Sequence, residues 1–111
     1  MKLMGLFENW KIEDFASAFR IKKSVLDGVN IVFAYYDYED YEGWAFVLFK
    51  RDGKLFEVIA SHCSCHGIEG QWEPEETTVE AVRHRVKIGE LGKAAGFAYV
   101  LLATLEGIKN D

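Results

Sequence analysis

Four side chains that bind soft metal ions lie within five consecutive residues of this sequence: His62, Cys63, Cys65 and His66. Thiolate and imidazole groups are the ligands that zinc prefers, and the same thiols could act as nucleophiles beside a histidine. In an extended segment, however, the cysteines point to one side and the histidines to the other, so one tetrahedral zinc cannot take all four. We therefore expect small packed side chains in a tight turn and no cofactor, with a zinc- or thiol-dependent module as the alternative.

A second stretch, residues 35–44, interleaves four tyrosines and a tryptophan with four carboxylates. Closely spaced carboxylates beside stackable rings resemble a strand of nucleic acid in charge and chemistry. Tyrosine also gives contact area at a small entropic cost. The pattern predicts a protein-binding surface, whereas the alternative is a pair of strand ends whose tyrosines pack inward while the acids face water. The residues expected to contact a partner are Tyr36, Asp37, Tyr38, Glu39, Asp40, Tyr41, Glu42 and Trp72.

Trp72 stands apart from that stretch, in a segment that also contains Glu69, Glu73 and Glu75. A tryptophan is amphipathic and can anchor a partner. In a loop it more often folds back over the edge of the core. Both roles stay open from the sequence alone.

The charge of the chain is unevenly distributed. Residues 37–80 hold eleven acidic and three basic side chains, a net charge of −8, while the rest of the chain carries +3. An acidic surface repels phosphate backbones and attracts the basic protein surfaces that hold nucleic acid. We therefore expect a protein partner and no direct binding of nucleic acid, although an acidic face that only maintains solubility is the alternative.

Length and composition predict one globular domain over residues 1–111, because half of the residues are apolar and only one is proline. The longest apolar stretch, residues 97–105, is far shorter than the roughly 20 residues that cross a bilayer. The first ten residues do not have the pattern of a secretory signal, and two cysteines one residue apart cannot form a stabilising disulfide framework. We expect a cytoplasmic protein without membrane contact. It lacks a phosphate-binding glycine loop and the common hydrolase signatures, so we predict that it is not an enzyme.

The periodicity predicts an α+β fold that begins with a helix, since Ile12, Phe15, Ala16 and Phe19 recur at helical spacing. Three strands follow at residues 29–36, 44–51 and 54–60, with a charged connection over residues 38–43. The second strand is apolar on both faces, as expected at the centre of a sheet. Asp52-Gly53 predicts a two-residue turn between the last two strands, which gives a three-stranded antiparallel meander.

The second half of the chain begins with a predicted ordered loop over residues 61–74. Two C-terminal helices are expected after it. Thr77 and Glu80 suggest a capping box at the start of the first, which would end at Gly89 or Gly92. The last helix is predicted over residues 94–106, where the alanine and leucine content favours a helix over a strand at residues 97–102.

The segments on which a resemblance rests are S-H-C-S-C-H-G-I-E-G-Q-W-E-P-E at residues 61–75 and T-V-E-A-V-R-H-R at residues 78–85, together with F-A-Y-Y and A-F-V-L-F at residues 33–36 and 45–49. This chain resembles a group of small proteins encoded by bacteriophages and prophages, most of which have no assigned activity. The position of His66 is often a tyrosine in that group, which argues against a shared four-ligand metal site. By association, the resemblance implies an inhibitor of host defence, such as an anti-CRISPR or anti-restriction protein.

These observations lead to one hypothesis about function. We expect a phage-type accessory protein that binds and inhibits a host protein through its acidic, tyrosine-rich region. The partner would be a nucleic-acid-binding component of a defence system. A homo-oligomeric structural protein, such as a homodimer, is a further alternative.

Overall fold

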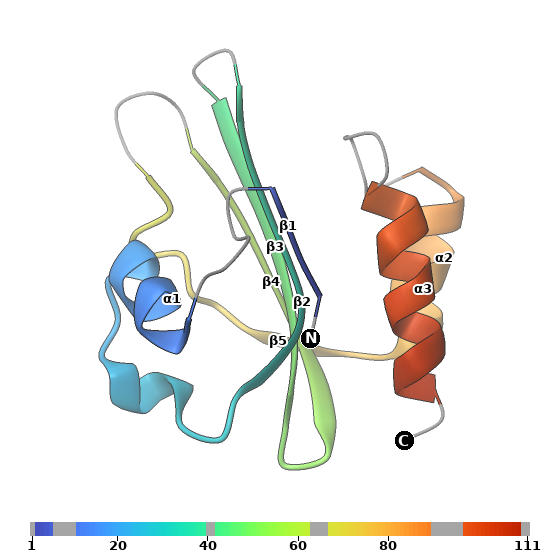
Figure 1. The fold of residues 1–111 in the computed structure, drawn as a ribbon, viewed down its shortest axis with the longest axis horizontal. Coiled ribbons are helices and arrows are strands. Elements are labelled where there is room, and N and C mark those ends of the chain that lie inside the picture. The colour runs from blue at the N-terminus through green and yellow to red at the C-terminus, as the bar shows by residue number, and fades with distance from the viewer. Residues whose placement is uncertain (1, 6–10, 40–41, 63–66, 90–96, 110–111) are drawn as a thin grey trace.

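A five-stranded sheet forms the middle of the protein, with helices on both of its faces (Figure 1). This computed structural model describes residues 2–5, 11–39, 42–62, 67–89 and 97–109. The strands lie side by side in chain order, β1-β2-β3-β4-β5. Their bounds are β1 Lys2–Gly5, β2 Asn30–Glu39, β3 Glu42–Arg51, β4 Lys54–His62 and β5 Glu75–Thr77.

Helices cover both faces of this sheet. One face carries α1 (Ile12–Phe19) and a short 3-10 helix, η1 (Lys23–Leu26), and the other carries α2 (Val79–Lys87) and α3 (Phe97–Lys109). The α+β class is as predicted, and so are the helix α1 and the two C-terminal helices, but the fold begins with the strand β1 and not with a helix. Within the described part of the chain, no helix combines the length and apolar character that crossing a membrane requires.

The predicted antiparallel meander is present as β2, β3 and β4. Asp52 and Gly53 both have positive φ angles, 54° and 75°. A type I′ turn requires this conformation at both central positions, and aspartate and glycine adopt it at low cost. β3 lies at the centre of the sheet, as its apolar character on both faces indicated.

Two further strands were not predicted, so the expectation of a three-stranded sheet is wrong. β1 pairs in parallel with β2, and β5 pairs antiparallel with β4. β1 has four residues and β5 has three, two of them exposed glutamates. Such short edge strands lack the alternation that identifies a half-buried strand in a sequence.

The hairpin of β2 and β3 is longer than predicted. We expected residues 38–43 to form a charged connection, but β2 continues to Glu39 and β3 begins at Glu42. Backbone hydrogen bonds form the ladder between strands, and they do not require apolar side chains. Charge therefore did not end these strands. β4 likewise continues two residues beyond its predicted end, to His62.

The start of α2 also differs from the prediction. Thr77 is the last residue of β5, and the helix is capped by Thr78, whose hydroxyl accepts a hydrogen bond of 3.0 Å from the amide of Ala81. Strand pairing with Leu55 places Thr77 before the cap. α3 is a helix across residues 97–102, as preferred, and residues 94–96 of its predicted range lie outside the described residues.

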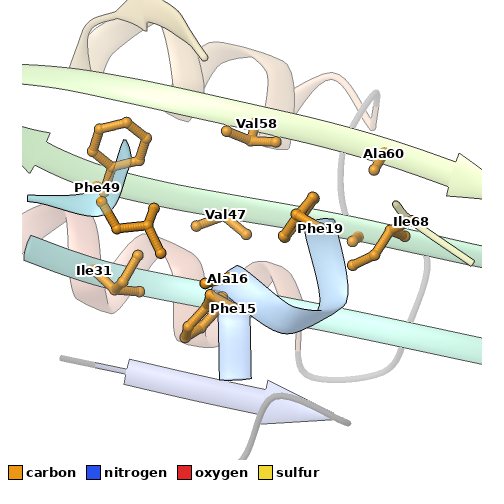
Figure 2. Close-up of a cluster of buried hydrophobic side chains, with 12 residues drawn as sticks. Phe15, Ala16, Phe19, Ile31, Val47, Phe49, Val58, Ala60 and Ile68 are labelled. Atoms are coloured by element: carbon orange, nitrogen blue, oxygen red, sulfur yellow. The ribbon is translucent and has the colours of Figure 1, made fainter. Parts of the chain in front are cut away.

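The core beneath α1 contains residues from all three meander strands (Figure 2). Ile31 and Ala34 both face this side although they are three positions apart. The register shifts between Ile31 and Phe33, so one extra residue lies in β2. A bulge of this kind reverses which face the following residues occupy. The buried side chains of this core are Phe15, Ala16, Phe19, Leu26, Ile31, Ala34, Ala45, Val47, Phe49, Val58, Ala60 and Ile68.

The core beneath α2 and α3 contains an ion pair among its apolar side chains. Glu57 of β4 is only 8% exposed, and its carboxylate accepts two hydrogen bonds from the guanidinium of Arg85 in α2, one of 2.9 Å. This bidentate contact fixes α2 to the sheet. The buried apolar residues of this core are Phe33, Tyr35, Phe46, Leu48, Leu55, Val82, Val86, Leu101 and Leu105.

Candidate functional site

The acidic positions of the predicted binding surface lie at the end of the β2–β3 hairpin. Asp37, Tyr38 and Glu39 are the last residues of β2, and Glu42 is the first of β3. Their backbone pairing is continuous, from Asp37 opposite Trp44 to Glu39 opposite Glu42. Asp40 and Tyr41 were predicted to belong to the same surface and lie outside the described residues.

This end of the hairpin extends beyond the neighbouring strands. Among the described residues, the pairing of β1 with β2 stops at Tyr36, and the pairing of β4 with β3 stops at Gly43. Figure 1 shows the hairpin passing both α1 and the near end of α3. Within the described chain, the backbone from Asp37 to Glu39 therefore pairs with β3 alone.

Tyr36 lies at the base of this hairpin end and takes part in an internal contact. Its hydroxyl hydrogen-bonds to Nε2 of His62, and the two rings meet edge to face with centroids 5.6 Å apart. The side chain of Tyr36 is half-buried against the α1-side core. These contacts join β2 to the end of β4.

Gly43 makes room for that contact. It lies opposite His62 in the β3–β4 ladder, and a Cβ atom at this position would overlap the imidazole of His62. Sequence reasoning missed this role. A glycine inside a strand pattern was the available signal, because such glycines often mark a close approach of another group.

The predicted metal or thiol site has one described member. Cys63, Cys65 and His66 lie outside the described residues, and His62 uses its Nε2 in the contact with Tyr36. Elsewhere in the described chain, no group of three or more histidine, cysteine, aspartate or glutamate side chains could hold a metal ion. The zinc- or thiol-dependent module stays a prediction.

Trp72 packs over the α1-side core. Its ring lies edge to face against Phe19 at 4.9 Å and stacks on Phe49 at 5.5 Å. The side chain is half-buried. These contacts correspond to the second role considered for Trp72, in which the ring covers the edge of the core. The ring therefore lies away from the acidic end of the hairpin.

The loop that carries Trp72 is fixed to β4 by Gln71, a residue that sequence reasoning did not single out. The Gln71 amide accepts a hydrogen bond from the backbone N–H of Ser61 at 3.0 Å and donates one to the Ser61 carbonyl at 2.8 Å. This two-point contact resembles the pairing of a further strand. The backbone N–H of Gly70 also donates to the Phe19 carbonyl at 3.0 Å, which ties the loop to α1.

The chain shows no match to models of protein families, to curated proteins or to solved structures. Fold class therefore rests on the architecture described above. The relation to phage-encoded proteins stays a prediction.

Proposed function

We propose that this protein is a non-enzymatic binding module that docks on a basic surface of a host protein through the end of its β2–β3 hairpin. The observation that carries the proposal is the register of the sheet. Among the described residues, acidic positions 37, 39 and 42 lie beyond the last pairs that β1 and β4 make with the hairpin. No helix of the described chain would have to move for a partner to approach this end.

The chemistry of the hairpin end favours a basic partner. Four carboxylates and two tyrosines occur within the six residues 37–42. Carboxylates steer a positively charged surface toward the site, and tyrosines add contact area with few rotatable bonds. Because the chain has a net charge of −5, long-range electrostatics also favour a cationic partner.

The base of the hairpin supports its use as a binding element. The contact between Tyr36 and His62 joins β2 to β4 directly below the acidic end, and Gly43 allows the ring of His62 to lie across β3. A hairpin held in one orientation loses less conformational freedom when it binds. The contacts that hold the hairpin in this orientation lie at the base of its acidic end.

The resemblance to phage-encoded proteins favours one class of host partner. Nucleic-acid-binding components of defence systems carry basic surfaces that hold phosphate backbones. An acidic hairpin would compete with nucleic acid for such a surface. We therefore propose inhibition by occupation, without a chemical step.

A capture experiment from bacterial lysate tests the hairpin as the docking element. One variant neutralises its acids through Asp37→Asn, Glu39→Gln, Asp40→Asn and Glu42→Gln. The matched control removes the same number of charges from exposed positions outside the hairpin through Glu73→Gln, Glu75→Gln, Glu76→Gln and Glu80→Gln. Both proteins are first compared with the wild type by thermal unfolding.

We expect the wild type and the control to retain the same host protein, and the hairpin variant to lose it. Retention should also fall as salt is raised, because exposed charges are screened. Equal recovery by the hairpin variant and the control would remove the basis of the proposal.

A further inference from the structure

A shallow groove of about 380 Å³ runs between α2 and α3 on the side of the helices that faces away from the sheet. The core-facing residues of the two helices are Val82, Val86, Leu101 and Leu105. Each helix turns by about 100° per residue, so the next residue after each of these points toward the outer side. Arg83 and Lys87 thereby form one wall. The other wall and the floor come from α3, with Tyr99, Leu102, Ala103 and Glu106.

The two ends of the groove differ in charge. At one end, Arg83 and Glu106 form an ion pair of 3.4 Å. α2 and α3 run in opposite directions, so Lys87 lies toward the Tyr99 end (Figure 1). Lys87 is exposed, and Arg83 has N–H donors beyond the one that faces Glu106. An anionic group could therefore contact Lys87 and Arg83 together.

Tyr99 gives the groove an aromatic surface. Among the side chains whose burial the structure describes, it is the most exposed large apolar one, with 80% of its area open to solvent. Leu102 and Ala103 add apolar floor beside it. A flat ring can stack on a tyrosine face, and contact with such a ring would cover apolar area that now faces water.

We propose that the α2–α3 groove binds a small molecule that combines a flat aromatic ring with an anionic group. The ring stacks on Tyr99 over Leu102, and the anion lies between Lys87 and Arg83. The volume of the groove falls in the range of small-molecule sites, which is about 300–1,000 Å³. This site is separate from the hairpin end and goes beyond the proposed docking function.

Two sources of this chemistry are tested separately by calorimetric titration of the whole chain. Adenosine monophosphate represents aromatic phosphates, and 2-naphthoate represents aromatic carboxylates. Saturable binding of either probe is expected. Binding of the nucleotide alone would assign the site to phosphates, and binding of the naphthoate alone would assign it to carboxylates.

Substitutions locate the binding. Lys87→Glu and Tyr99→Ala should each weaken the bound probe by about tenfold or more, because each removes one half of the proposed recognition. The matched controls are Lys54→Glu and Ile59→Ser, which change an exposed cation and an exposed apolar side chain elsewhere. These should bind as the wild type does.

Two results would overturn the proposal. The first is the absence of saturable binding for both probes while the protein is folded. The second is an equal loss of affinity in the groove variants and in their controls, which would show nonspecific adsorption.

Discussion

The body of the sheet and the end of the β2–β3 hairpin differ in what surrounds them. In the body, both faces of β3 are covered, so that Val47 and Leu48 are both fully buried although they face opposite helical layers. At the hairpin end, no described residue of β1 or β4 pairs with the hairpin, and α1 and α3 do not extend as far. The same two strands thus pass from a closed core to an open ribbon.

Under the proposed docking function, this difference assigns stability and partner binding to separate parts of one hairpin. Substitutions in the covered body should lower the free energy of unfolding and leave binding by the folded protein intact. Substitutions at the hairpin end should do the reverse. Unfolding measurements test the covered part of the molecule, and binding measurements test the hairpin end.

The largest effect is expected for Phe19→Ala in the covered body. Phe19 is fully buried beneath Trp72, so its removal should leave a cavity and cost about 3–5 kcal/mol of unfolding free energy. Chemical denaturation measures this change. Val25→Ala, at a 41% exposed position of η1, is the control and should cost far less. Similar losses in the two variants would contradict the assignment of this core.

Arg85→Ala tests the ion pair beneath α2. It leaves the carboxylate of Glu57 buried without its partner, which should cost about 3 kcal/mol in the same measurement. Arg83→Ala is the matched control from the same helix. Its partner Glu106 is 68% exposed, so this change should cost under about 1 kcal/mol. If the control cost as much as Arg85→Ala, burial would not be what makes this contact important.

A smaller effect is expected at the start of α2. Thr78→Ala removes the acceptor for the Ala81 amide and should cost about 1 kcal/mol. Thr77→Ala serves as the control because Thr77 belongs to β5. Thermal unfolding should show the larger decrease for Thr78→Ala. A larger decrease for Thr77→Ala would contradict the assignment of Thr78 as the cap and would favour Thr77, the residue predicted from the sequence.

The smallest effect is expected for the exposed ion pair of Glu13 and Lys23, which are 2.9 Å apart. The hydrogen bond from Lys23 lowers the pKa of Glu13 below its ordinary value of 4.5, and the bond with Glu13 raises the pKa of Lys23 above 10.5. A lowered carboxyl pKa stabilises the fold above pH 4.5, and this contribution disappears as the pH falls through the folded value. A raised lysine pKa stabilises it below pH 10.5, and this contribution disappears at higher pH.

Melting temperatures measured across pH test that pair. Glu13→Gln should melt slightly below the wild type near neutral pH, and the difference should close in acid. Glu76→Gln, at another exposed position, is the control for loss of charge alone. A difference that grows as the pH falls below 4.5 would contradict the sign of the Glu13 shift.

The sequence predicted the parts of the fold that have strong local signals. The helical spacing of Phe15 and Phe19, and the positive φ angles suited to Asp52-Gly53, each depend on nearby residues only. β1 and β5 were missed because their pairing depends on distant strands. Local periodicity does not contain that information.

For the candidate site, the sequence predicted which residues are acidic but not how the backbone presents them. Residues 38–43 were interpreted as a connection, whereas the strand pairing shows that β2 continues to Glu39 and that β3 begins at Glu42. Tyr36 could not be separated from the other tyrosines, because its contact with His62 joins residues 26 positions apart. The contact of Gln71 with Ser61 was equally invisible for the same reason.

The most direct test of the central claim is a map of where a cationic ligand contacts the protein. An oligolysine peptide is titrated into the ¹⁵N-labelled chain, and the backbone amide shifts are followed by NMR. We predict that the largest shifts occur at residues 37–39 and 42–44, at the end of the β2–β3 hairpin. The largest shifts at residues 75–80, the other acidic segment, or an even spread over both, would contradict the account.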